Sequence, residues 1–216
     1  QSRGLVQLVS GVYTEMAAVS RRLAGGGIEP QRFRAVHAKT DRTREIAIGY
    51  DEGGRIAELD LTNQGRPRES DVPEELQRGT VDPLTAFLRM CAWAPQAATG
   101  SAPVTLVVPV FDGRKRFDLE ATHRRRTRWA GPQGEVPALE LKVRLLARFG
   151  FEPDDELMTS PDDPEGRWLR VLASDEPYPI PLRIETIERG KGSVIELTRD
   201  CSDADGSGEG CASLRR

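Results

Sequence analysis

Two short stretches between Val81 and Leu119 decide the fold of this chain: Val81-Asp-Pro-Leu-Thr-Ala-Phe-Leu88 and Val108-Pro-Val-Phe-Asp-Gly-Arg-Lys-Arg-Phe-Asp-Leu119. The first predicts a helix that begins at Asp82 or Pro83, because aspartate caps helices and proline suits the first helical position. An apolar stripe then follows at helical spacing, made of Leu84, Phe87, Leu88 and Cys91. We expect this helix to end before Pro95, since proline disrupts a helix interior.

The second stretch predicts a β-hairpin closed by Asp112-Gly113, the preferred pair for a two-residue type I′ turn. Such a turn would set Val110 opposite Lys115, Val108 opposite Phe117 and Leu106 opposite Leu119. One face of the hairpin would then be apolar, and the other would carry Arg114, Arg116 and Asp118. The apolar face is expected to cover a core.

The rest of the chain predicts a β-meander, because short alternating runs are separated by turn residues. The expected strands are residues 13–23, 33–38, 44–50, 55–61, 137–149, 167–174, 181–188 and 193–199. In the second predicted hairpin, Ile48 would face Ala57 and Ile46 would face Leu59. Residues 62–73 are expected to be a polar connection, followed by one helical turn at 74–78. The fold class is therefore mainly β: a curled antiparallel sheet or open barrel with one amphipathic helix packed on its concave side.

Length and composition predict one β-rich domain over residues 1–199 and a disordered tail over residues 200–216, which is rich in Ser, Gly and Asp. The 216 residues include 38% hydrophobic and 30% charged residues with a net charge of −3, so nucleic acid is not an expected partner. No apolar run approaches the roughly 20 residues of a transmembrane segment. Because the sequence starts at Gln1 without an export signal, we expect an N-terminally truncated fragment.

The two deciding stretches resemble a bacterial domain-of-unknown-function family, number 3108. Members carry an Asp-Pro-Leu-(Ser/Thr)-Ala-(Leu/Phe)-Leu helix start, here residues 82–88, and a Pro-Val-Phe-Asp-Gly hairpin that continues to Arg-(Tyr/Phe)-Asp-Leu, here residues 109–119. Residues 179–185 and 190–197 are similar to the closing strand pair of the family. The resemblance covers about residues 4–199. It implies an exported periplasmic protein of the Gram-negative cell envelope, made with a signal peptide and shaped like the open barrels that carry lipoproteins. Shape alone does not transfer function.

One departure from the family pattern concerns cysteine. Many members have a cysteine shortly before the hairpin aspartate and another in the strand after it, and the corresponding positions here are Val104 and Leu141. We expect hydrophobic contact in place of the implied bridge. Cys201 and Cys211 could close a small loop in an oxidising compartment, whereas Cys91 is expected to stay buried and reduced.

Two functional classes remain open. In the first, a non-enzymatic envelope protein holds an apolar or lipid-like ligand in a cavity between helix and sheet, lined by Leu84, Phe87, Leu88, Val108, Phe117 and Leu119. In the second, the protein is an interaction scaffold whose interior is solid and whose partner is another envelope protein. An empty pocket or a packed core at the helix–sheet interface would distinguish the two.

We expect no catalytic site, cofactor or metal centre. His37 and His123 are taken as ordinary exposed strand residues, and no Gly-x-Ser-x-Gly nucleophile turn is present. The basic run 123–129 is interpreted as a solvated strand end, and the acidic run 152–165 as a mobile loop. Residues 203–208 imitate the start of a calcium loop, but its position 12 would be Leu214 rather than glutamate.

Overall fold

The computed structural model describes residues 2–8, 12–39, 42–131, 134–151, 167–187 and 194–196. Its strands form two antiparallel six-stranded sheets in which neighbours in the chain are neighbours in space. Sheet A contains β1 (Ser2–Leu8), β2 (Val12–Arg22), β3 (Ile28–Lys39), β4 (Arg42–Tyr50), β5 (Ile56–Asn63) and β6 (Arg66–Arg68). Sheet B contains β7 (Thr105–Phe111), β8 (Arg116–Gly131), β9 (Gly134–Phe149), β10 (Trp168–Ser174), β11 (Pro181–Ile187) and β12 (Val194–Glu196). The predicted mainly β, antiparallel fold is confirmed.

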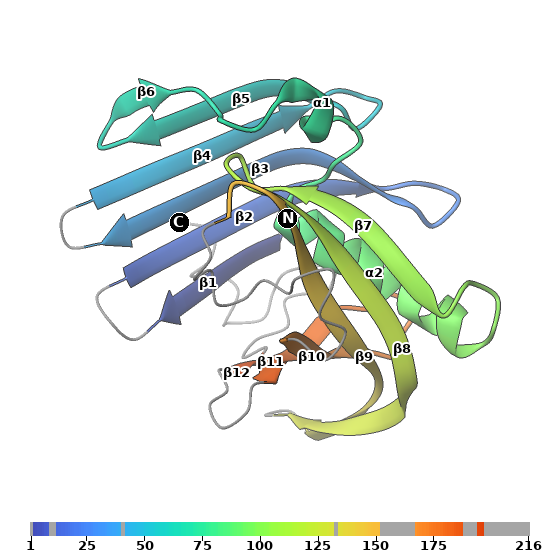
Figure 1. Ribbon diagram of the computed structural model, residues 1–216. Helices are drawn as coiled ribbons and strands as arrows, with labels where there is room; N and C mark the ends of the chain where they lie inside the picture. The colour runs from blue at the N-terminus through green and yellow to red at the C-terminus, as the bar shows by residue number, and fades with distance from the viewer. Residues whose placement is uncertain are drawn as a thin grey trace, which may run out of the picture.

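The main helix, α2 (Pro83–Ala98), lies between the two sheets (Figure 1). It begins where the sequence predicts, with Asp82 as the N-cap: the Asp82 carboxylate accepts a hydrogen bond from the Thr85 amide at 2.9 Å. The Thr85 hydroxyl donates a second bond to Asp82 at 2.6 Å. The single helical turn α1 (Glu74–Gln77) precedes it, also as predicted.

The predicted end of the helix before Pro95 is wrong, because α2 continues through Pro95 to Ala98. Proline removes one backbone hydrogen bond from the helix interior. Packing compensates for that loss: Ala94 is fully buried, and Ala97 and Ala98 pack against the core of sheet B. The helix stops instead at Thr99, and Gly100 follows with a positive φ of 75°.

Both predicted hairpin registers are wrong by two residues. Val108 pairs with Leu119 and Val110 with Phe117, while in sheet A Ile46 pairs with Leu61 and Ile48 with Leu59. The cause is a longer turn in each case, which begins with an aspartate whose carboxylate accepts two backbone N–H groups. Asp112 Oδ1 accepts from Arg114 and Lys115 at 2.8 and 2.7 Å, and Asp51 Oδ1 accepts from Gly53 and Arg55 at 2.8 and 2.9 Å. Because side chains alternate between the two faces of a strand, a register shift of two residues keeps every side chain on its predicted face.

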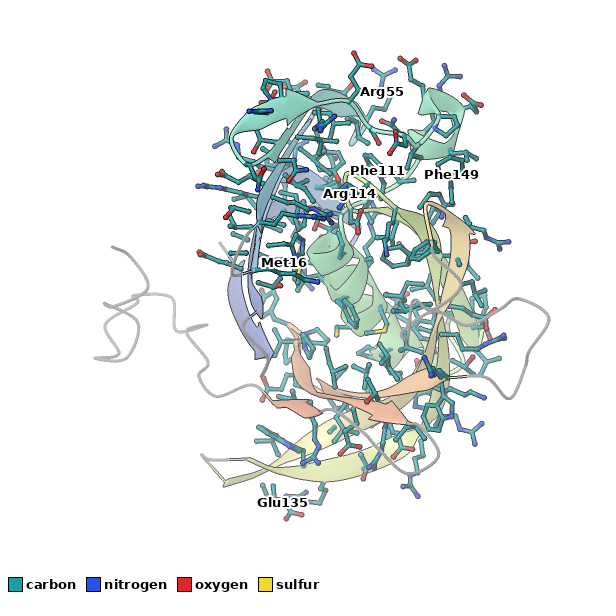
Figure 2. The ribbon with its side chains drawn as sticks, turned by 60° about the vertical axis from the view of Figure 1, so that its left-hand side comes forward. Met16, Arg55, Phe111, Arg114, Glu135 and Phe149 are labelled. Atoms are coloured by element: carbon teal, nitrogen blue, oxygen red, sulfur yellow. The ribbon has the colours of Figure 1, made fainter. Side chains whose placement is uncertain are left out.

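The core has two main parts, one under each sheet. The part under sheet B includes Met90 and Ala94 of α2 with inward residues of β7–β10 such as Leu141 and Val171. The part under sheet A contains Phe33, Ile46 and Ile48, and it also takes in Phe111 from the end of β7. Figure 2 shows Phe111 at the hairpin end of sheet B, turned toward sheet A. The hairpin β7–β8 therefore joins the two cores.

The outer face of that hairpin is less solvated than expected. Asp118 is 7% exposed and forms ion pairs with Arg116 at 2.7 Å and with Arg148 at 2.8 Å. The expected polar connection over residues 62–73 also contains the short edge strand β6, whose residues are all exposed. No described helix is long and apolar enough to span a membrane.

Several predictions lie outside the described residues. They are the acidic run 152–165, the calcium-like stretch 203–208, the Cys201–Cys211 pairing and the disordered tail over residues 200–216.

Candidate functional site

The six residues predicted to line one apolar cavity are divided between packed regions. Val108, Phe117 and Leu119 belong to the core under sheet B and are at most 8% exposed. Phe87 is half-buried against that same core, whereas Leu84 packs against the core under sheet A. Leu88 is half-buried. The helix separates the members of this set, and a ligand role for them stays a prediction.

A groove of about 540 Å³ lies elsewhere, at the ends of β2 and β3 that are nearest to α2. Three backbone segments form its rim: the β2–β3 turn from Leu23 to Ile28, the β4–β5 turn at Gly53 and Gly54, and the segment before α2. One side of α2 forms its wall through Arg89, Ala92, Trp93 and Gln96. Its volume falls within the roughly 300–1,000 Å³ typical of small-molecule sites.

The rim owes its shape to glycine. Gly26, Gly54 and Gly79 all have positive φ, at 83°, 70° and 71°, which residues with a side chain rarely adopt. The β4–β5 turn also packs closely on the start of β3, since a Cβ at Gly54 would lie 3.4 Å from the Glu29 side chain. At these glycines the rim presents backbone, with no side chain, to the groove.

The groove has an apolar wall with a fixed aromatic ring. Leu23, Ile28 and Ala92 contribute aliphatic surface, and Trp93 is 8% exposed. The Trp93 indole N–H donates to the Pro103 carbonyl at 3.1 Å, which holds the ring in place. Such a surface favours the apolar part of a ligand.

Arg89 supplies the positive charge of the groove. Its Nε donates to the Ile28 carbonyl at 2.7 Å, and burial lowers the pKa of its guanidinium although Asp82, Tyr50 and Glu29 oppose the shift. Glu29, the acidic residue of the groove, is already paired with Arg21 at 2.9 Å. Among the described residues, no carboxylate lies within ion-pair distance of Arg89. The remaining guanidinium donors are available to an anion.

Cys91 is on the neighbouring helix turn but is fully buried, and burial raises the pKa of its thiol to about 12. It is a small core residue, as the sequence predicts. In the described part of the chain, no three acidic, histidine or cysteine side chains are grouped as metal ligands.

The two histidines are not ordinary exposed residues. His37 and His123 are both half-buried on the inner faces of their sheets, and the Nε2 atom of His123 is buried without a hydrogen-bond partner. Neither lines the groove. The alternation in β3 gives the reason for His37, since Phe33 and Ala35 share its face and are buried.

The basic run 123–129 lies within β8 rather than at a strand end. Its four arginines are exposed, and three of them form ion pairs: Arg125 with Glu140 at 3.1 Å, Arg126 with Asp175 at 3.0 Å and Arg128 with Glu135 at 2.9 Å. The expected contact of Val104 with Leu141 does not fit the structure, because Val104 is 60% exposed while Leu141 is fully buried.

Sequence reasoning missed the groove for a topological reason. Its glycines are visible as turn residues, but three turns far apart in the chain meet only once the meander is folded around α2. Nothing in the spacing around Arg89 marks it as a groove residue.

The sequence profile of the family described as "Protein of unknown function (DUF3108)" matches residues 2–198. Comparisons with curated proteins and with solved structures gave no match.

Proposed function

This chain belongs to the DUF3108 family, whose function is unknown, and we propose that it is a non-catalytic binding protein of the bacterial cell envelope. Its ligand is a small amphiphile with one anionic group, held in the groove beside α2. The observation that carries this proposal is Arg89, a half-buried arginine without a described ion-pair partner in a groove that also contains Trp93.

The physical argument rests on desolvation. Taking a guanidinium partly out of water is unfavourable unless an anion and hydrogen bonds replace the lost hydration. The Ile28 carbonyl satisfies only one donor of Arg89. A carboxylate or phosphate would satisfy the others in the planar geometry that arginine favours, and an alkyl chain would cover Leu23, Ile28 and Trp93.

We propose the periplasm as the location, on the basis of the family resemblance. Osmotic-shock fractionation of cells that carry the native gene should release the protein with periplasmic markers. Mass spectrometry of that material should show a cleaved leader peptide. Recovery with cytoplasmic markers would contradict this location.

A scaffold role is the second candidate, and the edge of sheet B favours it. β7 is an edge strand that Val81 covers only near Pro109 and Phe111. Beyond that cover, Val104 and Val107 are 60% and 50% exposed. An uncovered edge with apolar side chains can take an additional strand from a partner protein.

Binding of dodecanoate and dodecanol by calorimetry tests the ligand proposal. The wild type should bind the carboxylate more tightly than the alcohol. Arg89→Gln should weaken dodecanoate binding about tenfold, or about 1.4 kcal/mol, with little effect on dodecanol. Arg55→Gln is the matched control, because Arg55 is 81% exposed on the neighbouring turn and pairs with Asp51. It should leave both affinities unchanged.

A second variant keeps the test independent of Arg89. Ala92→Phe should fill part of the groove and weaken both probes while the thermal midpoint stays close to that of the wild type. Equal binding by wild type and both groove variants would overturn the ligand proposal. In that case the edge of sheet B becomes the leading candidate for function.

A further inference from the structure

A row of polar side chains crosses the inner face of sheet A at the end opposite the groove. The strand register places Thr14 next to His37, His37 next to Arg44, and Arg44 next to Asn63. The next row toward the groove is apolar and consists of Met16, Ala35, Ile46 and Leu61. Since side chains two residues apart share a face, the polar row lies on the same inward face as the core under sheet A.

The hairpin of sheet B brings a further arginine to this row. Gly113 lies directly on the apolar row, so that a Cβ at this position would be 2.6 Å from Ile46 and 3.1 Å from Leu61. Arg114 follows it at the tip of the hairpin, and Figure 2 shows Arg114 on the side of sheet A. Arg114 is close enough to influence the titration of both His37 and Arg44.

Positive charge dominates this cluster. Arg42 and Arg114 each lie within electrostatic range of Arg44, and none of the three has an ion-pair partner among the described residues. In the described part of the chain, Asp112 is the carboxylate that acts on His37, and its Oδ1 atom already accepts two amides of its own turn. The Oδ1 atom of Asn63 is buried without a hydrogen-bond partner. The row therefore has unused polar groups as well as unbalanced charge.

We propose that Arg44, Arg114 and His37, with the Thr14 and Asn63 side chains beside them, form a binding site for a phosphate group. Two arginines can offer several parallel N–H donors to the oxygens of one oxyanion, and such charge-assisted hydrogen bonds are stronger than those between neutral groups. The site is separate from the groove, because it lies at the opposite ends of β2 and β3. It does not depend on the function proposed for the groove.

His37 gives the site a pH dependence with a definite sign. Burial lowers the pKa of His37. The nearby charges of Arg114 and Arg44 lower this pKa further, whereas the charge of Asp112 raises it. Thr14 Oγ1 lies 3.2 Å from His37 Nδ1. A bound dianion would favour the protonated imidazole, so affinity should rise as the pH falls through the His37 pKa. Sulfate is the suitable probe for this pH dependence, because its charge stays constant over the pH range in which His37 titrates.

NMR titration with inorganic phosphate, and with sulfate at several pH values, tests the site at constant ionic strength. The largest chemical-shift changes of backbone amides should occur in the polar row and at the hairpin tip around Arg114. Arg114→Gln, on an exposed loop, should weaken binding about tenfold without affecting folding, and Arg44→Gln should do the same or more. His37→Gln should abolish the pH dependence of sulfate binding.

The matched control is Arg34→Gln, which removes one positive charge from the outer face of β3. There the Arg34 guanidinium lies 3.4 Å from the Glu45 carboxylate. It should change the affinity by less than about twofold. Equal weakening by Arg34→Gln and Arg114→Gln, or shifts spread over all surface arginines, would overturn the proposal.

Vesicles identify the source of the phosphate. If the group belongs to a lipid, phosphatidylglycerol vesicles should bind the wild type more tightly than phosphatidylcholine vesicles, with the same loss in Arg114→Gln. If the group is a soluble phosphate, inorganic phosphate should bind and neither vesicle should. Absence of binding to phosphate and to both vesicles would reject the site.

Discussion

Gly113 shows how much of this fold depends on one missing side chain. It has a φ of 98° and lies against the buried Ile46 of the opposite sheet. The aspartate before it holds the turn, and the arginine after it lies within electrostatic range of His37 and Arg44 in the polar row. Close approach of the two sheets and the position of Arg114 thus have a common origin in this residue.

Gly113→Ala should lower the free energy of unfolding by about 2–4 kcal/mol, because strain at positive φ adds to overpacking against Ile46. Gly65→Ala is the control: Gly65 also has a positive φ, of 70°, but a Cβ there meets nothing within 4 Å. It should lose only about 1 kcal/mol. Urea unfolding of both variants measures the difference, and equal losses would contradict the close approach.

Among the elements, α2 has the most specific attachment to its surroundings. Its N-cap Asp82 is fully buried, and the Thr85 hydroxyl that bonds to Asp82 also lies 2.8 Å from Ser20 of β2. Farther along, Arg89 bonds to the start of β3. The first half of the helix is therefore tied to sheet A by polar bonds, while its small and apolar residues pack on sheet B.

The cap predicts a pH dependence of stability. Burial raises the pKa of Asp82 above its ordinary value of 3.8, so the folded state binds this proton more tightly than the unfolded state does. Its contribution to stability is fully present below the unfolded pKa and is lost as the pH rises through the folded pKa. Residue 82 cannot titrate in the Asp82→Asn variant. Relative to that variant, the wild type should therefore lose stability as the pH rises from the unfolded to the folded pKa of Asp82.

Asp51→Asn is the control with the opposite sign. Hydrogen bonds from the backbone, that of Arg55 first, lower the pKa of Asp51. Relative to this variant, the wild type should gain stability as the pH rises. Urea unfolding of the three proteins at intervals across the acid range measures both slopes. Parallel curves for the wild type and Asp82→Asn would contradict the buried cap.

Sequence alone could predict the elements but not how they meet. Asp82, Pro83 and the alternating strands are local signals, and each led to the correct element. The two hairpin registers failed because the residues after each aspartate allow turns of different lengths, and only the folded backbone decides between them. The sequence places Arg114 on the polar face of its hairpin and gives no signal at Arg89 or Arg44, since the neighbours of all three come from strands or turns distant in the chain.

Taken together, the molecule is two sheets that share their interiors. Phe111 of β7 is fully buried in the core under sheet A, and Leu84 of α2 packs there as well. At the opposite end, the Arg22 guanidinium lies 4.7 Å from the centre of the Tyr178 ring, which connects β2 with the β10–β11 loop. We expect these contacts to make the two sheets one cooperative unit rather than two domains.

Phe111→Ala tests that cooperativity. The truncation should cost about 3–5 kcal/mol, because it removes a large side chain from a closed core. The three tryptophans, Trp93, Trp129 and Trp168, all lie in α2 or sheet B, whereas the cavity would open under sheet A. Tryptophan fluorescence and far-UV circular dichroism should nevertheless show the same reduced denaturation midpoint. Separate midpoints would mean that the sheets unfold independently.

The position of Phe111 in the chain has a consequence for biosynthesis. Every strand of sheet A precedes it, so when the chain is expressed in the cytoplasm without a leader peptide, the ribosome completes that sheet before the residue that closes its interior has been made. Until then Phe33, Ile46 and Ile48 have no cover from the hairpin, and a nascent chain in this state is a substrate for chaperones and a starting point for aggregation. Translation slowed shortly before Phe111 should therefore reduce the soluble yield more than translation slowed after β9.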